Sequence, residues 1–280
     1  GTGVLMNDST VLSKANFQGE LSFLEPMFKR ENQSLQARIF GRYYGSYQVP
    51  LAIERRIGGE VTLARQFVAF KNLTGSIGFG VEDVYLEEGD EKRIKKKYAS
   101  SNMPYSMRKE ELTDGLYVKI TPALTYDTRD SSVNARHGLL ARISFEENIA
   151  ISGTTFGKLY GMARKFMPIG KKSSFVLTAK AGGKIHGHMP EFAGFSLGGP
   201  YTIRGLNISE VGTGDGYMLG SAELRVPVPF VDRLTSNTFV NNLRLAAFVD
   251  AGTIFNKSIG TKLYDRPGYA ISAGVGLRVF

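Results

Sequence analysis

One arginine and one aspartate, each in its own short motif, carry the strongest chemical signal in this sequence. Arg204 lies in the glycine-rich stretch Gly198-Gly199-Pro200-Tyr201-Thr202-Ile203-Arg204-Gly205-Leu206. Asp250 lies in Phe248-Val249-Asp250-Ala251-Gly252. A guanidinium removed from bulk water needs a fixed anion beside it, because desolvating the charge is otherwise very costly. The two motifs therefore predict an ion pair between a loop tip and a strand; the alternative is that Arg204 is an exposed loop residue and Asp250 a solvated charge.

Alternation of side chains places Asp250 on the polar face of a long strand. Over residues 242–255, one face carries Leu243, Leu245, Ala247, Val249 and Ala251, and the other carries Arg244, Ala246, Phe248, Asp250 and Gly252. Residues 117–129, 217–228 (with Glu223 on the polar face) and 271–279 alternate in the same way. A soluble barrel would have an apolar inside, so charged inner faces favour a membrane barrel. A soluble antiparallel sheet with one wet face is the alternative.

The lengths of the segments also favour a membrane. These runs exceed the usual five or six residues of a globular strand and suit tilted membrane strands of about 9 to 11 residues. We predict about twelve strands, over residues 2–7, 16–25, 34–44, 52–67, 72–86, 115–129, 138–148, 154–168, 173–186, 215–228, 242–255 and 267–280. The connections 129–137 and 168–172 are short, whereas 87–114 and 187–214 are long and polar. This alternation is typical of outer-membrane barrels.

The composition of the chain excludes several other classes of site and partner. The chain has 280 residues, a net charge of +9 and no cysteine, which excludes a disulfide scaffold and a cysteine-ligated metal. Its basic residues are spread along the chain, and the one dense run, 92–97, follows an acidic one, so we predict no nucleic-acid partner. No run of about 18 apolar residues is present, which excludes a transmembrane helix.

Catalytic and metal motifs are weak. His186 and His188 could share a strand face toward a metal, but His137 is remote and no third ligand is evident. Residues 212–216 lack the Gly-Lys-Ser/Thr ending of a phosphate loop, and no Ser/His/Asp spacing stands out. We therefore predict no metal, no cofactor and no enzymatic activity.

Taken in order, the motifs resemble those of the BamA-type outer-membrane assembly-factor superfamily, the bacterial surface antigen barrel domain. Gly198-Gly199 followed by Ile203-Arg204-Gly205-Leu206 is similar to the tip of the family's sixth extracellular loop, although Leu206 replaces the usual aromatic residue. The stretch 248–252 is similar to the aromatic-x-aspartate-x-glycine motif of the thirteenth strand. Glu223, ahead of a Pro-x-Pro turn, and residues 124–130 fit two further signatures.

The resemblance implies an all-β fold, an antiparallel transmembrane β-barrel in a single domain over residues 1–280. It also implies that Arg204 reaches into the lumen and pairs with Asp250 and Glu223, with Gly198, Gly199 and Gly205 bending the loop inward. About twelve of about sixteen barrel strands are expected in this chain. The first and last strands, the periplasmic POTRA domains and an export signal are expected to lie outside it.

The function implied by the resemblance is to fold and insert β-barrel proteins into the outer membrane of a cell. The implied partners are unfolded outer-membrane proteins, outer-membrane lipids, and accessory assembly proteins bound through POTRA domains. Three alternatives stay open: a two-partner secretion translocator of the same superfamily, an ordinary porin or structural barrel, and a soluble β-sandwich.

Overall fold

The computed structural model describes residues 16–49, 52–88, 114–170, 172–228 and 243–279, which form one antiparallel sheet. Its strands are β1(Phe17–Glu25), β2(Gln33–Gly45), β3(Ala52–Gln66), β4(Leu73–Glu88), β5(Gly115–Asp127), β6(Gly138–Ala150), β7(Phe156–Ile169), β8(Ser173–Gly187), β9(Phe195–Leu197), β10(Gly212–Pro227), β11(Leu243–Lys257) and β12(Tyr269–Val279). Each long strand pairs with the next long strand along the chain, and the short β9 pairs with the start of β10. This order is the all-β antiparallel arrangement that alternation predicts.

The predicted strand boundaries agree closely with the observed ones. Eleven of the predicted segments are strands, each within three residues at either end. The predicted segment 2–7 lies outside the described residues. The short β9, the 3-10 turn η1(Glu191–Ala193) and the helix α5(Ile259–Leu263) were not predicted. They lie in connections, where no alternation marks them.

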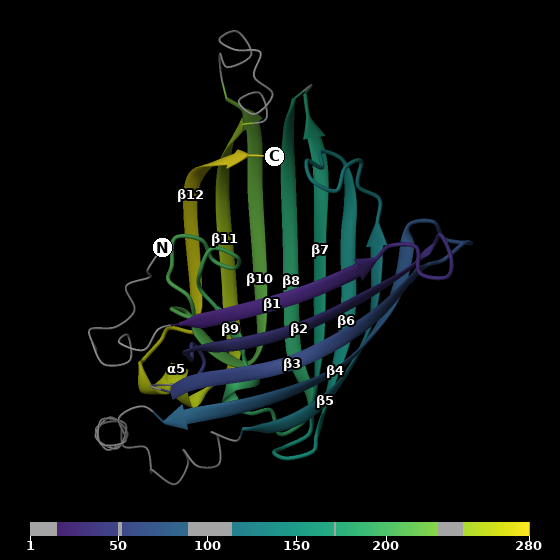
Figure 1. The fold of residues 1–280 in the computed structure, drawn as a ribbon. Helices are drawn as coiled ribbons and strands as arrows, with labels where there is room; N and C mark the ends of the chain where they lie inside the picture. The colour runs from purple at the N-terminus through teal and green to yellow at the C-terminus, as the bar shows by residue number, and fades with distance from the viewer. Residues whose placement is uncertain (1–15, 50–51, 89–113, 171, 229–242, 280) are drawn as a thin grey trace.

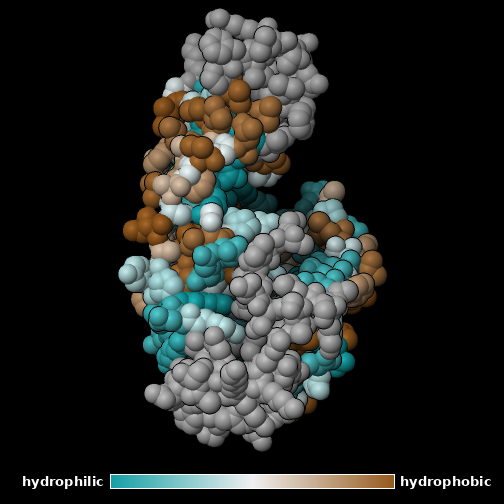
Figure 2. All heavy atoms as spheres, turned by 90° about the vertical axis from the view of Figure 1, so that its left-hand side faces the viewer, coloured by the Kyte–Doolittle hydropathy of each residue, from teal (hydrophilic) through white to brown (hydrophobic). Residues whose placement is uncertain are grey.

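The sheet has an apolar outer face and a polar inner face, as alternation predicts for a membrane strand. On β12, Ile271 is 77% exposed and Val275 is 83% exposed, whereas Asp250 on the neighbouring β11 is fully buried. In Figure 2, brown apolar side chains gather on the outer flank of the upper half, and teal hydrophilic ones line the hollow beside it. Exposed apolar bands of this size suit contact with lipid and not with water.

The sheet curls strongly without closing. Figure 1 shows β1–β5 crossing in front of β8–β12, so that the two groups of strands form opposite walls. Among the described strands, β1 pairs only with β2 and β12 pairs only with β11. The polar inner faces of both walls therefore line one shared lumen. Within the ranges given above, no helix has the length and apolar character needed to cross a membrane.

The strands end alternately at two rims. β4 and β8 end at one rim, where the connection 188–211 begins, and β5, β7 and β10 end at the other, where the connection 128–137 begins. Residues 89–113, 171 and 229–242 lie outside the described part, so the expected contrast between a rim of long loops and a rim of short turns stays a prediction. Residues 188–211, which contain η1 and β9, contact inner-face side chains of both walls. We call this stretch the lumenal segment.

Candidate functional site

Glycines shape the lumenal segment on both sides of its arginine. Gly198, Gly199 and Gly205 have φ angles of +115°, +102° and +87°, a region that side chains disfavour. A Cβ at Gly198 would also lie 2.4 Å from the carbonyl oxygen of Asn207. The Gly198 N–H donates to Oγ1 of Thr202 at 3.0 Å, which closes a tight turn. The turn directs the following residues toward the wall formed by β10 and β11.

Arg204 and Asp250 form a two-pronged ion pair. Nε of Arg204 donates to Oδ2 of Asp250 at 2.7 Å, and Nη2 donates to Oδ1 at 2.7 Å. The backbone N–H of Arg204 adds a third bond to Oδ2 at 3.1 Å. Asp250 is fully buried, and the side chain of Arg204 is 19% exposed to solvent. Parallel bonds of this kind fix orientation as well as charge, so the loop tip has a defined position.

Strand β10 supplies the rest of the arginine's partners. Nη1 of Arg204 donates to Oε2 of Glu223, and Nη2 donates to Oγ of Ser221 at 3.0 Å. Ser221 stands opposite Asp250 in the strand register and donates to its Oδ1 at 2.6 Å. Glu223 also accepts from Nε of Arg225 at 2.7 Å and from Nη2 of Arg278 at 2.6 Å. Three guanidinium groups thus meet two buried carboxylates across β10, β11 and β12.

An aromatic ring completes the environment of the guanidinium. The guanidinium carbon of Arg204 lies 3.7 Å from the ring centroid of Phe248, a short cation–π contact. Gly274 on β12 makes room for that ring, since a Cβ there would lie 2.7 Å from its Cζ. Hydrogen bonds to Asp250 raise the pKa of Arg204 above its ordinary value. The guanidinium therefore stays charged at neutral pH.

Apolar side chains beside Arg204 hold the tip against the same wall. Ile203 and Leu197 are fully buried, and Gly252 lies under both of them. Leu206 packs on the same cluster from its edge. The cluster comprises Leu197, Ile203, Val211, Tyr217, Leu219 and Ile254. An aliphatic side chain thus occupies the position for which an aromatic residue is usual in the resembled family.

The structure brings the predicted residues of the two motifs, and Glu223, into one constellation. Sequence reasoning did not single out Ser221, Arg225 or Arg278, although alternation puts all three on inner faces. Ser221 and Arg225 lie two residues before and after Glu223, on the same face of β10, and Arg278 lies on β12, two strands away. These positions were the signal that could have identified them. Of the two histidines, His186 pairs through Nε2 with Oε2 of Glu147 at 2.8 Å. No group of three metal-ligating side chains occurs in the described ranges.

Comparison with known proteins identifies one family and several relatives. The Omp85 superfamily domain matches residues 1–280 of this chain. Protein TOC75 of Pisum sativum chloroplasts is 30% identical over 107 residues, which are 34% of this chain and 12% of TOC75. The sorting and assembly machinery component 50 homolog of Mus musculus is 27% identical over 203 residues, 64% of this chain and 42% of that protein. The chain thus spans less than half the length of these relatives.

Solved structures agree on the fold. BamA from Haemophilus ducreyi lacking POTRA domains 1–3 superposes with a TM-score of 0.69 at 19% identity, over 94% of this chain and 56% of that one. CdiB from Acinetobacter baumannii superposes with a TM-score of 0.54 at 13% identity, over 95% of this chain and 44% of that one. At these identities the likeness concerns the architecture of the barrel alone.

Proposed function

This chain belongs to the Omp85 superfamily of outer-membrane barrels, and from that premise we propose that it is the barrel of an assembly factor. The proposed activity is to fold and insert other β-barrel proteins into an outer membrane. Its substrates would be unfolded outer-membrane proteins, with membrane lipids against its apolar outer face. Accessory assembly proteins would bind through POTRA domains, which are not among the elements described above. The proposed role is not enzymatic.

The observation that carries this proposal is the attachment of the lumenal segment through Arg204 to Asp250 and Glu223. A segment folded into the lumen and held by buried charge has one defined position instead of many. We propose that this contact keeps the barrel wall in the state that receives a substrate strand, which would add to a sheet edge by backbone pairing. An ordinary porin should not fold substrate proteins, so the test below separates it from an assembly factor.

A translocator of the two-partner secretion type is the second candidate. The structural likeness to CdiB favours it, although that likeness is smaller than the likeness to BamA. The same attached segment would then close a conduit for one exported protein. The two candidates differ in what is lost when the protein is absent: many membrane barrels in one case, one secreted protein in the other.

The test is reconstitution of the whole protein in liposomes with a small unfolded β-barrel substrate. Folding is followed by the mobility shift of the folded barrel in unheated gels. We expect faster folding than in empty liposomes, and a loss of most of that gain in Arg204→Ala. A protein that leaves substrate folding at the rate of empty liposomes is not an assembly factor, and depletion that removes one secreted protein alone would favour the translocator.

Tyr201→Ala is the matched control for this test. Tyr201 lies in the same tip, and its side chain is 88% exposed. Its backbone oxygen accepts from Nζ of Lys180 at 3.2 Å, a contact that the substitution leaves in place. We expect this variant to fold substrate as the unmodified protein does. Equal losses in Tyr201→Ala and Arg204→Ala would remove the ion pair from the mechanism.

A further inference from the structure

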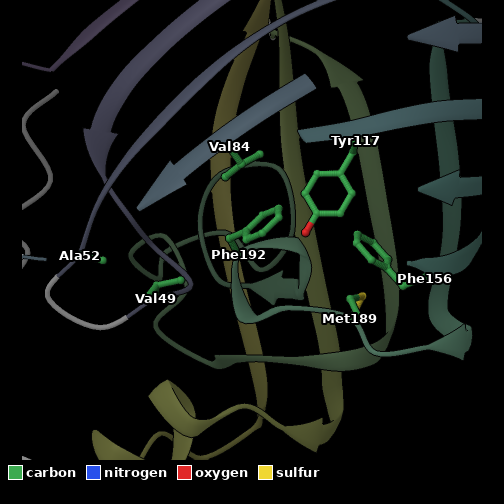
Figure 3. Packing of buried hydrophobic residues seen from close by; sticks show 7 residues of the cluster. All are labelled: Val49, Ala52, Val84, Tyr117, Phe156, Met189 and Phe192. Atoms are coloured by element: carbon green, nitrogen blue, oxygen red, sulfur yellow. The ribbon is translucent and has the colours of Figure 1, made fainter. Parts of the chain in front are cut away.

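The lumenal segment also touches the opposite wall, far from Arg204. Just after β8, Met189 and Phe192 enter an apolar cluster on the wall formed by β3, β4 and β5 (Figure 3). Phe192 points between Val84 and Tyr117, and its ring centroid lies 5.9 Å from that of Tyr117, edge to face. The buried members of the cluster are Val49, Ala52, Val84, Tyr117, Phe156, Met189 and Phe192. The start of the segment is therefore buried against a wall, as its tip is.

A second arginine binds the segment at this place. Nη2 of Arg56, on β3, donates to the backbone oxygen of Phe192 at 2.9 Å. The guanidinium carbon also lies 5.1 Å from the Phe192 ring centroid. One side chain thus contacts both the backbone and the ring of a single loop residue. The arrangement parallels Arg204 and Phe248, with the roles of wall and loop exchanged.

Arg56 is itself fixed by buried acids. Its Nε donates to Oε1 of Glu54, which is fully buried, and its Nη1 lies 3.4 Å from Oε1 of Glu82. Glu54 accepts further bonds from the hydroxyls of Tyr44 at 2.6 Å and Ser46 at 2.8 Å. A buried carboxylate with this many donors is pre-organised, because each donor offsets part of its desolvation cost. The guanidinium fork is therefore held in place, directed at Phe192.

We propose that Arg56 is a positioning residue for the lumenal segment, and that the segment is a strut held independently at two walls. At the first wall, Arg204 of the segment binds Asp250 on β11 and Glu223 on β10. At the second wall, Arg56 on β3 binds the backbone oxygen of Phe192 in the segment. Each hold fixes its own end, since Phe192 and Arg204 are separated by β9 and the glycine turn. The inference concerns the mechanics of the segment and stands whether the protein assembles barrels or exports a protein.

The experiment uses cysteine reporters in the whole protein, to which residues 1–280 contribute no cysteine of their own. Met189→Cys reports on the Arg56 end and Ile203→Cys on the Arg204 end; both native side chains are buried. The rate of labelling by a water-soluble maleimide measures local opening of each end. Each reporter is combined in turn with Arg56→Ala, Arg204→Ala and Arg55→Ala.

Arg55→Ala is the matched control, because Arg55 is the neighbouring arginine on the opposite face of β3, where it stacks on Tyr85. We expect Arg56→Ala to raise labelling at Met189→Cys about tenfold over this control while Ile203→Cys changes less than about twofold. Arg204→Ala should show the reverse pattern. A general loss of structure would raise both rates together, so selectivity is what identifies positioning.

Arg56→Lys covers the case in which Arg56→Ala does not fold. Lysine keeps the positive charge between Glu54 and Glu82 but lacks the fork that also reaches the Phe192 oxygen. We expect a selective rise at Met189→Cys in this variant too. Unchanged labelling at Met189→Cys in the folded variants overturns the proposal, as do equal rises at both reporters. Neither result would depend on substrate folding, so the assembly function is tested separately.

Discussion

Gly252 lies directly beneath Ile203: a Cβ built at Gly252 would be 3.2 Å from Cδ1 of Ile203. The same atom would be 3.0 Å from Cδ1 of Leu197 and 3.0 Å from the backbone oxygen of Met218. The glycine that follows Asp250 by two residues is therefore explained by packing. It allows the residue before Arg204 to lie flat on β11, which brings the guanidinium within reach of the aspartate.

The first prediction follows from that contact. Gly252→Val should lift the tip from the wall and destabilise the fold by about 1–3 kcal/mol, the usual cost of overpacking. Protease cleavage within 198–211 should be faster in this variant, measured on the folded protein in detergent. Gly276→Ala on β12 is the control, since a Cβ there would meet nothing within 4 Å. Equal protection of the two variants would contradict the packing argument.

The second prediction concerns the coupling between Arg204 and Asp250. Removing either partner leaves the other charge buried, which costs about 3–5 kcal/mol. The double variant Arg204→Ala, Asp250→Ala should therefore be less destabilised than the sum of the single variants, by about 0.5–3 kcal/mol. Urea unfolding of all four proteins, followed by gel mobility, measures this difference. Strict additivity would mean that the two residues do not act as a pair.

The sequence predicted this pair because both members carry a pattern. Alternation places Asp250 on an inner face, and the glycines mark the bend before Arg204. The residue types then indicate the pairing, because a buried cation and a buried anion each need a partner of opposite charge. The strand boundaries were predictable for a similar reason: one wet and one lipid-facing side give a period of two along every long strand.

The hold at Arg56 was not predicted, and its chemistry explains why. Alternation places Arg56 on an inner face, but its acceptor on the segment is a backbone oxygen, that of Phe192. A backbone oxygen is present at every residue and leaves no mark in the sequence. Which one is used depends on the path of residues 188–197 through the lumen. That path is set by the apolar cluster around Tyr117, whose members come from five separate parts of the chain.

The third prediction separates two glycines of the loop. Gly198→Ala should cost more than Gly205→Ala, although both have positive φ angles. Each substitution places an alanine in a left-handed backbone conformation, which destabilises the fold by about 1–2 kcal/mol. Only Gly198→Ala also forces a Cβ against the backbone oxygen of Asn207, at 2.4 Å, whereas Gly205 has open space around it. Melting temperatures of the two variants should rank in this order, and the reverse order would contradict the steric reason.

The fourth prediction concerns pH and the turn between β5 and β6. Asp130 accepts through Oδ1 from the backbone N–H groups of Arg136 at 2.9 Å and His137 at 3.2 Å. Slight burial raises the pKa of Asp130, but these hydrogen bonds outweigh it and hold the pKa below its ordinary value. The folded turn therefore binds a proton less readily than the unfolded chain does. Its contribution to stability is complete above the ordinary value, about 3.9, and is lost as pH falls through the lowered one.

Backbone amide signals of Arg136 and His137, followed by NMR as the pH is lowered, measure the titration of Asp130 directly. We expect both signals to shift together with a midpoint below about 3.9, the ordinary value for aspartate. In Asp130→Asn the amide oxygen can still accept both bonds but cannot titrate, so the shift should disappear while the turn persists. A midpoint at or above the ordinary value would mean that the two N–H groups do not stabilise the charged carboxylate.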